Sequence, residues 1–428
     1  MFLIYTDIVT PRLQYVADFV FREQFGQLLK ITDQPEEFEA YEGYRIRYAQ
    51  EFLEGPWFNM PVAGLLSEKG IRQFEVPVSE WEQYPVIFGG ERGDIPYDLF
   101  SAVFFLLSRY EEYWPHDKDL YGRYPHTSSI AFKYDFLHLP VVNIWLTQLS
   151  NALKAHYPGL ELPRPAFYFQ PTYDIDIAWS YRHKGFLRNL GGFLQRPDFS
   201  RWKILAGAGQ DPYDSYNWLD RVHDHFELKP IYFFLVASAR SRYDKNISPS
   251  NPAMRKLIER HARKYAVGIH PSWSSHDNRP LIGEEKRTVS LITEKPVTAS
   301  RQHYIWFQTP STFRDLISAG ITDDYSMGYG SINGFRASVA SAYHWYDLER
   351  EEKTGLRVHP FCFMDANAFY EQKQDVQTSA GELIHYYDTC HQYHGTLISI
   401  FHNQFLGTDP VFAGWKEMYE AFISQVQR

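Results

Sequence analysis

Residues 166–176 read Ala-Phe-Tyr-Phe-Gln-Pro-Thr-Tyr-Asp-Ile-Asp, an apolar run that leads into two carboxylates. The run predicts a buried strand over Ala166–Gln170, and Pro171, which lacks an amide donor, is expected to mark the end of regular pairing. Asp174 and Asp176 are two positions apart, so on an extended chain both side chains leave the same face. Two such acids suit a site in which one binds a metal and the other acts as a base. The alternative is an exposed strand end with Asp as a turn former.

The composition is that of an ordinary folded protein, with 44% hydrophobic and 22% charged residues. A chain of 428 residues can bury a large core and is expected to form two domains. The net charge is −9 and no long basic run occurs, so nucleic acid is not an expected partner. Aromatic residues make up 17% of the chain, and aromatic faces can stack on sugar rings, although most will line the core.

The sequence predicts neither a signal peptide nor a membrane span. The first residues, Met1–Asp7, lack a basic region and a sustained apolar core. No run of about 18 apolar residues occurs. The two cysteines, Cys362 and Cys390, are too few for a disulfide framework. These features together predict a cytoplasmic protein.

The pattern of expected strands and helices changes near residue 160, where Pro158, Pro163 and Pro165 mark a linker. Residues 1–160 are expected to form a smaller mixed α/β domain. Its expected elements are a strand at Phe2–Tyr5 and helices at Arg12–Phe25, Ser101–Tyr110 (capped by Asp98) and Pro140–Ala155.

Residues 161–428 are expected to form a second domain in which strands alternate with helices. The expected strands are Ala166–Gln170, Ile231–Val236, Ala266–His270, Pro296–Ser300 and Leu397–Phe401. The expected helices lie around Tyr216–Phe226, Asn251–Lys264, Gly283–Thr293 and Ser311–Ala319. Repeated β-α units imply a mostly parallel sheet or barrel, in which chemistry gathers at the C-terminal ends of the strands.

Polar side chains lie at several of these strand ends. His270 ends one strand and could bind a metal through a neutral imidazole nitrogen. Arg301 and His303 follow the next strand, where the first could orient a carboxylate and the second could be a further ligand. His402 follows the last strand and is a candidate general acid. Each of these residues could instead be an ordinary loop residue. Among the expected strands, only the one ending at Val236 has no such polar residue at its end.

With these residues the region from about 165 to 410 resembles the polysaccharide deacetylases, carbohydrate esterase family 4. The resemblance implies an irregular (β/α)7-type barrel that removes acetyl groups from sugars with one divalent metal, commonly zinc. It implies that Asp174 is the base, that Asp176 and His270 are metal ligands, and that His402 protonates the leaving amine. Arg301 matches the family's Arg motif. The arrangement also looks like a variant bacterial group with an N-terminal domain of unknown role.

Two positions depart from or duplicate the family pattern. The family's second motif has another His four residues after the first, and this chain has Ser274 there. His303, on a strand end, is preferred as the substitute ligand, and His276, on the loop, remains the alternative. Arg336, in the stretch Gly-Phe-Arg-Ala-Ser, also resembles the Arg motif and competes with Arg301 for that role.

The resemblance implies a metal-dependent hydrolase that deacetylates an amino sugar or an acetylated glycan, with the carbohydrate as its partner. Two alternatives remain open at this point. One is a hydrolase of another non-peptide C–N bond on the same barrel. The other is a metal-free carbohydrate-binding or assembly protein, which Ser274 favours because it removes an expected ligand.

Overall fold

The structure is a computed structural model that describes residues 1–90, 92–195 and 197–426. The chain divides into two compact units, each made of several stretches of sequence. The first comprises Met1–Tyr168, Gly334–Pro360 and Thr389–Thr396, and the second comprises Phe169–Asn333, Phe361–Asp388 and Leu397–Arg428. Three segments that the sequence analysis places in the second domain thus lie in the first unit, namely residues 161–168, Gly334–Pro360 and Thr389–Thr396. Independent folding on either side of residue 160 stays a prediction.

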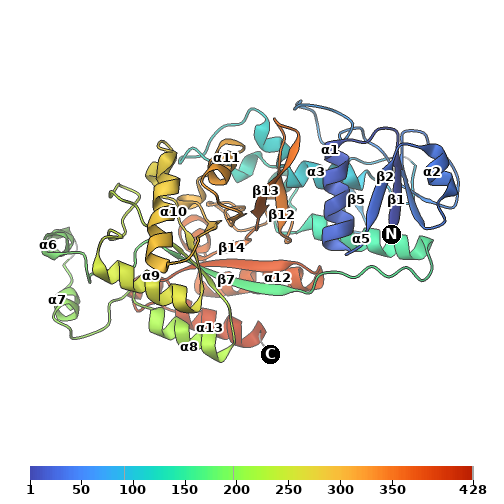
Figure 1. Cartoon of the computed structure of the whole chain (residues 1–428). Coiled ribbons are helices and arrows are strands. Elements are labelled where there is room, and N and C mark those ends of the chain that lie inside the picture. Colours follow the sequence, from blue (N-terminus) through green and yellow to red (C-terminus); the bar gives the residue numbers. More distant parts are fainter. Residues whose placement is uncertain (91, 196, 427–428) are drawn as a thin grey trace. The chain divides into compact units, whose positions relative to one another are not determined.

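The first unit is mixed α/β and contains a parallel sheet in the order β2-β1-β3-β4 (Figure 1). Strands β5 and β6, and likewise β12 and β13, pair antiparallel. The elements are β1 (Phe2–Thr6), α1 (Pro11–Ala17), β2 (Leu29–Thr32), α2 (Pro35–Ala40), β3 (Tyr44–Tyr48), β4 (Phe58–Asn59), β5 (Val78–Trp81), β6 (Tyr84–Ile87), α3 (Leu99–Leu107), α4 (Ile130–Lys133), α5 (Val141–His156), β12 (Tyr343–Asp347) and β13 (Glu352–Val358).

Helix α3 is buried along its whole length, as its nearly continuous apolar sequence predicts. The Asp98 carboxylate caps it by accepting the Ser101 backbone N–H at 2.9 Å, which confirms the predicted cap. The helix predicted from Arg12 to Phe25 is present as α1 followed by a π-helical segment, Asp18–Gln24.

The second unit is built on seven strands, within the described residues, in the order β11-β10-β9-β8-β7-β15-β14. The neighbouring strands β11 and β10, β10 and β9, β9 and β8, β8 and β7, and β15 and β14 pair in parallel. The strands are β7 (Tyr168–Ile175), β8 (Ile231–Phe234), β9 (Ala266–Ile269), β10 (Ala299–Ser300), β11 (Asp323–Asp324), β14 (Phe363–Met364) and β15 (Thr396–His402). The helices are α6 (Phe186–Gln195), α7 (Ser200–Leu205), α8 (Tyr216–His225), α9 (Pro252–Lys264), α10 (Pro280–Thr293), α11 (Ser311–Ser318), α12 (Val376–Gln392) and α13 (Trp415–Val426).

The two edge strands of this order approach each other through the segments beside them. The Phe361 N–H, just before β14, donates to the Met327 carbonyl, just after β11, at 3.1 Å. The Met364 N–H donates to Asn333 Oδ1 at 2.9 Å. The strands therefore curl toward closure, which confirms the predicted α/β class with an irregular barrel-like unit.

Strand β7 corrects the prediction made from Pro171. It runs through Pro171 to Ile175, rather than ending at Gln170. Pairing with β8 begins only at Thr172, opposite Ile231, so the missing amide of Pro171 costs no hydrogen bond to β8. Asp174 consequently lies inside the strand, and Asp176 is the first residue beyond it.

The helices of this unit pack against the strands and against one another. Helices α8 and α13 are far apart in sequence but lie side by side (Figure 1). The ring of Trp218 on α8 lies 6.2 Å from that of Tyr419 on α13. None of the helices in the described ranges combines the length and the apolar character needed to cross a membrane.

Candidate active site

The C-terminal ends of the strands in the second unit bring most of the predicted residues together. Asp176 follows β7, His270 follows β9, and Arg301 follows β10 with His303 two residues later. His402 is the last residue of β15. Parallel strands end at one rim of a barrel, so these side chains share one mouth.

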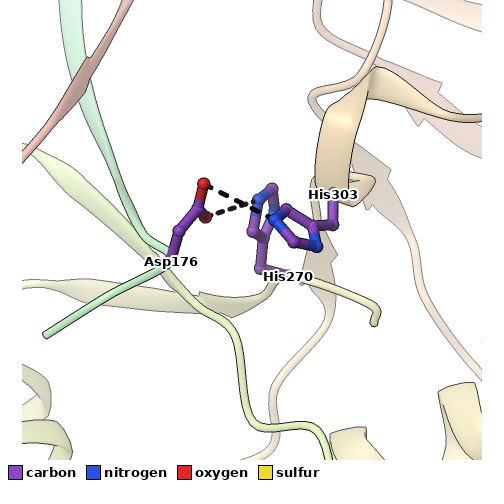
Figure 2. Close-up of side chains that lie close together, drawn as sticks. All are labelled: Asp176, His270 and His303. Atoms are coloured by element: carbon purple, nitrogen blue, oxygen red, sulfur yellow. Dashed lines mark ion pairs between the residues drawn. The ribbon is translucent and has the colours of Figure 1, made fainter. Parts of the chain in front are cut away.

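Three of them form a compact cluster of metal-ligating atoms. One ligand atom each from Asp176, His270 and His303 lies within 4.8 Å of the other two. Figure 2 shows the Asp176 carboxylate facing both rings. His270 Nε2 lies 3.1 Å from Asp176 Oδ1, and His303 Nε2 lies 3.5 Å from Asp176 Oδ2.

The other ring nitrogen of each histidine faces an oxygen acceptor. His270 Nδ1 lies 2.5 Å from the Arg301 carbonyl, and His303 Nδ1 lies 3.2 Å from Asp244 Oδ1. A proton on Nδ1 leaves the lone pair of Nε2 directed at the cluster. Two imidazole nitrogens and one carboxylate oxygen form the donor set of catalytic zinc sites, so these residues fit a zinc-type cation.

The charges in the cluster stabilise one another. Burial alone would lower the pKa of His303, but the Asp176 and Asp244 carboxylates raise it to about 9. Burial would raise the pKa of Asp176, but the His303 and His270 rings lower it well below its usual range. The carboxylates of Asp176 and Asp244 thus create a negative field around His303, and a field of this sign would also stabilise a bound cation.

Asp174 is buried beside this cluster and is held by Arg301. Arg301 Nη1 donates to Asp174 Oδ1 at 2.9 Å and to Thr172 Oγ1 at 2.7 Å. The other Asp174 oxygen lies 3.9 Å from His270 Nε2. Arg301 reaches Asp174 across the barrel interior, where its guanidinium lies 4.5 Å from the centre of the Phe233 ring. The pair supplies a buried, oriented carboxylate next to the candidate metal ligands.

His402 approaches the cluster from β15. Its Nε2 lies 3.5 Å from Asp176 Oδ2. Its Nδ1 lies 2.6 Å from Asp365 Oδ1, and its backbone N–H donates to Asp365 Oδ2 at 2.7 Å. Burial alone would lower the pKa of His402, but Asp365 and Asp176 raise it well above its usual range. The two carboxylates therefore favour the protonated form of this ring.

Two predicted candidates lie elsewhere. Arg336 belongs to the first unit, where its Nε and Nη2 donate to the two carboxylate oxygens of Glu112, each at 2.8 Å. Among the residues described, the metal-ligating cluster does not include His276. The His276 ring packs on Trp306, with centres 3.5 Å apart, and burial lowers its pKa to about 3. The geometry therefore favours Arg301 over Arg336 and His303 over His276.

Sequence reasoning missed the two aspartates that orient the histidines. Asp365 follows the short strand β14, and the apolar run Phe361–Met364 before it carried the same strand-then-acid signal as Asp174. Asp244 lies in the loop after β8, the strand expected to contribute nothing. Its position ten residues beyond Phe234 has no sequence signature, since only the fold brings that loop to His303.

A family model described as "Family of unknown function (DUF7033)" matches residues 2–158, which lie in the first unit. No curated protein matches the chain.

Several solved structures are similar in fold. A protein from Mycobacterium smegmatis, assigned to the polysaccharide deacetylases, is 11% identical, with 63% of this chain and 86% of that chain covered and a TM-score of 0.41. Another such protein, from Pseudomonas aeruginosa, is 13% identical, with 73% of this chain and 91% of that chain covered and a TM-score of 0.40. Puue allantoinase is 15% identical, with coverage of 73% and 91% and a TM-score of 0.35. At these values the similarity concerns the fold and assigns no activity.

Proposed function

We propose that the second unit is a metal-dependent hydrolase of the polysaccharide deacetylase type, which removes an acetyl group from an amino sugar or an acetylated glycan. The observation that carries the proposal is the cluster of Asp176, His270 and His303, whose ligand atoms lie within 4.8 Å of one another. These residues would hold one divalent cation, with zinc favoured by the two imidazoles. When bound, the cation would acidify a water molecule and polarise the acetyl carbonyl.

Asp174 has the position and partners of a general base. It lies beside the cluster, and Arg301 orients its carboxylate by donating to Oδ1. It would accept the proton of the attacking water as the water oxygen bonds to the acetyl carbon. The contact with Arg301, which fixes the direction of this carboxylate, is therefore part of the proposed chemistry.

His402 has the position and partners of a general acid. Asp365 orients the ring through Nδ1, which leaves Nε2 directed into the mouth of the barrel. A proton on Nε2 would pass to the sugar nitrogen as the C–N bond breaks, releasing acetate and the free amine. The acid and the base come from β15 and β7, which are adjacent strands of the order.

Metal content tests the ligand set before any substrate is known. Elemental analysis of the zinc-loaded wild type is expected to give close to one zinc per chain. Asp176→Ala and His303→Ala should lose it, whereas His276→Ala should retain it. A wild type that binds no zinc even when supplied would rule out the metal-hydrolase mechanism and favour a metal-free carbohydrate-binding protein.

Acetate release from N-acetylglucosamine oligomers tests the chemistry. The zinc-loaded wild type should release acetate, and Asp174→Asn should keep its zinc but lose the activity. A panel of cyclic amides and formyl amides tests the alternative of another C–N bond. Activity confined to that panel would keep the metal site and replace the proposed substrate class.

A further inference from the structure

Helices α6 and α7 form a small hairpin, described over residues 181–195 and 197–205, whose apolar side chains are exposed to an unusual degree. The exposed fractions are 67% for Phe186, 83% for Leu187, 73% for Leu194 and 73% for Phe199. A single exposed apolar residue needs no explanation, but four of them within one short hairpin form a patch. In Figure 1 the two helices stand away from β7 and β14 of the same unit.

The hairpin is amphipathic and internally ordered. In α6 the apolar residues recur at the spacing that places them on one helix face. One edge of this face contacts α7, where the Phe186 and Phe193 rings lie 6.0 and 5.7 Å from the Trp202 ring. The other edge carries Leu187 and Leu194, which are exposed. Arg201 joins the helices by donating to the Asn189 carbonyl at 2.6 Å.

The same hairpin is basic within an acidic protein. In the part of it that the structure describes, the basic residues are Arg182, Lys184, Arg188, Arg201 and Lys203, and the acidic residue is Asp198. The whole chain carries a net charge of −9. Positive charge is therefore gathered on the element that exposes the apolar patch, and it favours an anionic partner.

Part of this positive charge lacks compensation. In the described residues neither Lys184 nor Arg188 forms an ion pair, and Arg188 Nη2 donates to the Lys245 carbonyl at 2.7 Å. Burial and the neighbouring Arg188 lower the pKa of Lys184 to about 7. Burial and Arg240 lower the pKa of Arg188 to about 10. An anion bound here would relieve this like-charge repulsion.

We propose that the α6–α7 hairpin attaches the protein to the surface of an anionic lipid bilayer. Leu187, Leu194 and Phe199 insert among the acyl chains, and the lysines and arginines of the hairpin contact lipid phosphates. An apolar face combined with basic residues is the composition of helices that lie in the membrane interface. This attachment requires no membrane-crossing helix, and it does not depend on the proposed hydrolase activity.

Vesicle sedimentation with the full-length protein tests the proposal. Wild type should sediment with vesicles of phosphatidylcholine and phosphatidylglycerol but not with phosphatidylcholine alone, and high salt should release it. The double variant Leu187→Ser/Leu194→Ser should bind on the order of tenfold more weakly for each leucine. Lys203→Gln, which replaces an exposed lysine, should weaken binding about fivefold.

The matched control is Leu291→Ser, since Leu291 is 69% exposed on α10, outside the hairpin. It should bind vesicles like wild type, and all variants should keep the wild-type melting temperature because the replaced side chains are exposed. Wild type that does not sediment with anionic vesicles, or equal loss in Leu291→Ser, would overturn the proposal. So would a dimer in size-exclusion chromatography that the double variant dissociates, because the patch would then be a protein interface.

Discussion

Asp244 and Asp365 allow a matched pair of substitutions that separates metal binding from proton donation. Each carboxylate faces the Nδ1 atom of one histidine, Asp244 at His303 and Asp365 at His402. Replacing either by Asn keeps the size of the side chain and removes its charge. Asp244→Asn should weaken zinc binding, and Asp365→Asn should leave zinc in place but lower kcat.

The magnitude for Asp244→Asn follows from the contacts. The amide oxygen can still accept from the Trp273 N–H, which Asp244 Oδ1 now accepts at 2.8 Å. What is lost is the charge of the acceptor facing His303. A hydrogen bond to a charged acceptor contributes roughly 1 kcal/mol more than a neutral one, which is about five- to tenfold in affinity. Loss of such a supporting partner typically costs about 10–100-fold in metal affinity, and the 3.2 Å contact favours the lower end.

Asp365→Asn should act more strongly on catalysis. Both of its oxygens accept hydrogen bonds from His402, from Nδ1 at 2.6 Å and from the backbone N–H at 2.7 Å. An amide offers one acceptor, so one of these contacts is lost and the ring loses its charged partner. General acid catalysis contributes about 10²–10⁴-fold to rate, and a loss of at least about 10²-fold in kcat is expected.

The assay is competition for zinc with a fluorescent chelator, followed by acetate release from the loaded enzyme. The expected pattern is a crossed one: weaker zinc with Asp244→Asn, and slower turnover at full zinc occupancy with Asp365→Asn. Unchanged zinc affinity in Asp244→Asn would show that His303 is not a ligand oriented by this carboxylate. Loss of zinc in Asp365→Asn would instead make His402 part of the ligand set.

Three further predictions follow from the contacts of both units. Arg336→Met should lower the free energy of unfolding of the first unit by about 3–5 kcal/mol, because Glu112 loses a buried partner, and it should leave zinc bound. Arg301→Met should instead abolish acetate release, because Asp174 loses its partner. Zinc at about a hundred times its Kd should stabilise wild type by about 2.7 kcal/mol in thermal unfolding, and Asp176→Ala should remove this gain. Burial would raise the pKa of Glu112, but Arg336 and Arg109 lower it to about 2. Glu112 therefore stabilises the fold above about pH 4.3 and loses about 3 kcal/mol as the pH falls toward 2, so urea unfolding of Glu112→Gln and wild type should converge there.

The residues that sequence reasoning found share one local signal. Asp174, His270, Arg301 and His402 each lie in or next to an apolar run that forms a parallel strand, and parallel strands end at one rim. That signal needs only the period and composition of a few residues. The prediction that the strand ends at Pro171 was wrong. A missing backbone amide ends a strand only where the neighbouring strand would accept a hydrogen bond from it, and β8 pairs with β7 only from Thr172 onward. The local sequence around Pro171 does not contain this register.

The choice between Arg301 and Arg336 could not be made from the sequence, since both follow patterns that resemble one motif. It depends on the assignment of the segment Gly334–Pro360 to the first unit. That assignment is a matter of long-range packing, expressed in contacts such as Arg336 with Glu112, 224 residues apart. No window of local sequence contains such information.

Ser274 shows why the loss of one motif position is weak evidence for the loss of a site. A metal site requires ligand atoms at the right points in space, and these atoms can come from any part of the sequence. His303 Nε2 lies 3.5 Å from the Asp176 carboxylate, although His303 is outside the motif. The Ser274 hydroxyl donates to Asp244 Oδ2 at 3.5 Å, and that carboxylate orients His303 through its other oxygen. Ser274, which stands where the family pattern has a histidine, thus contacts Asp244. Asp244 is the carboxylate that faces His303, the proposed substitute ligand.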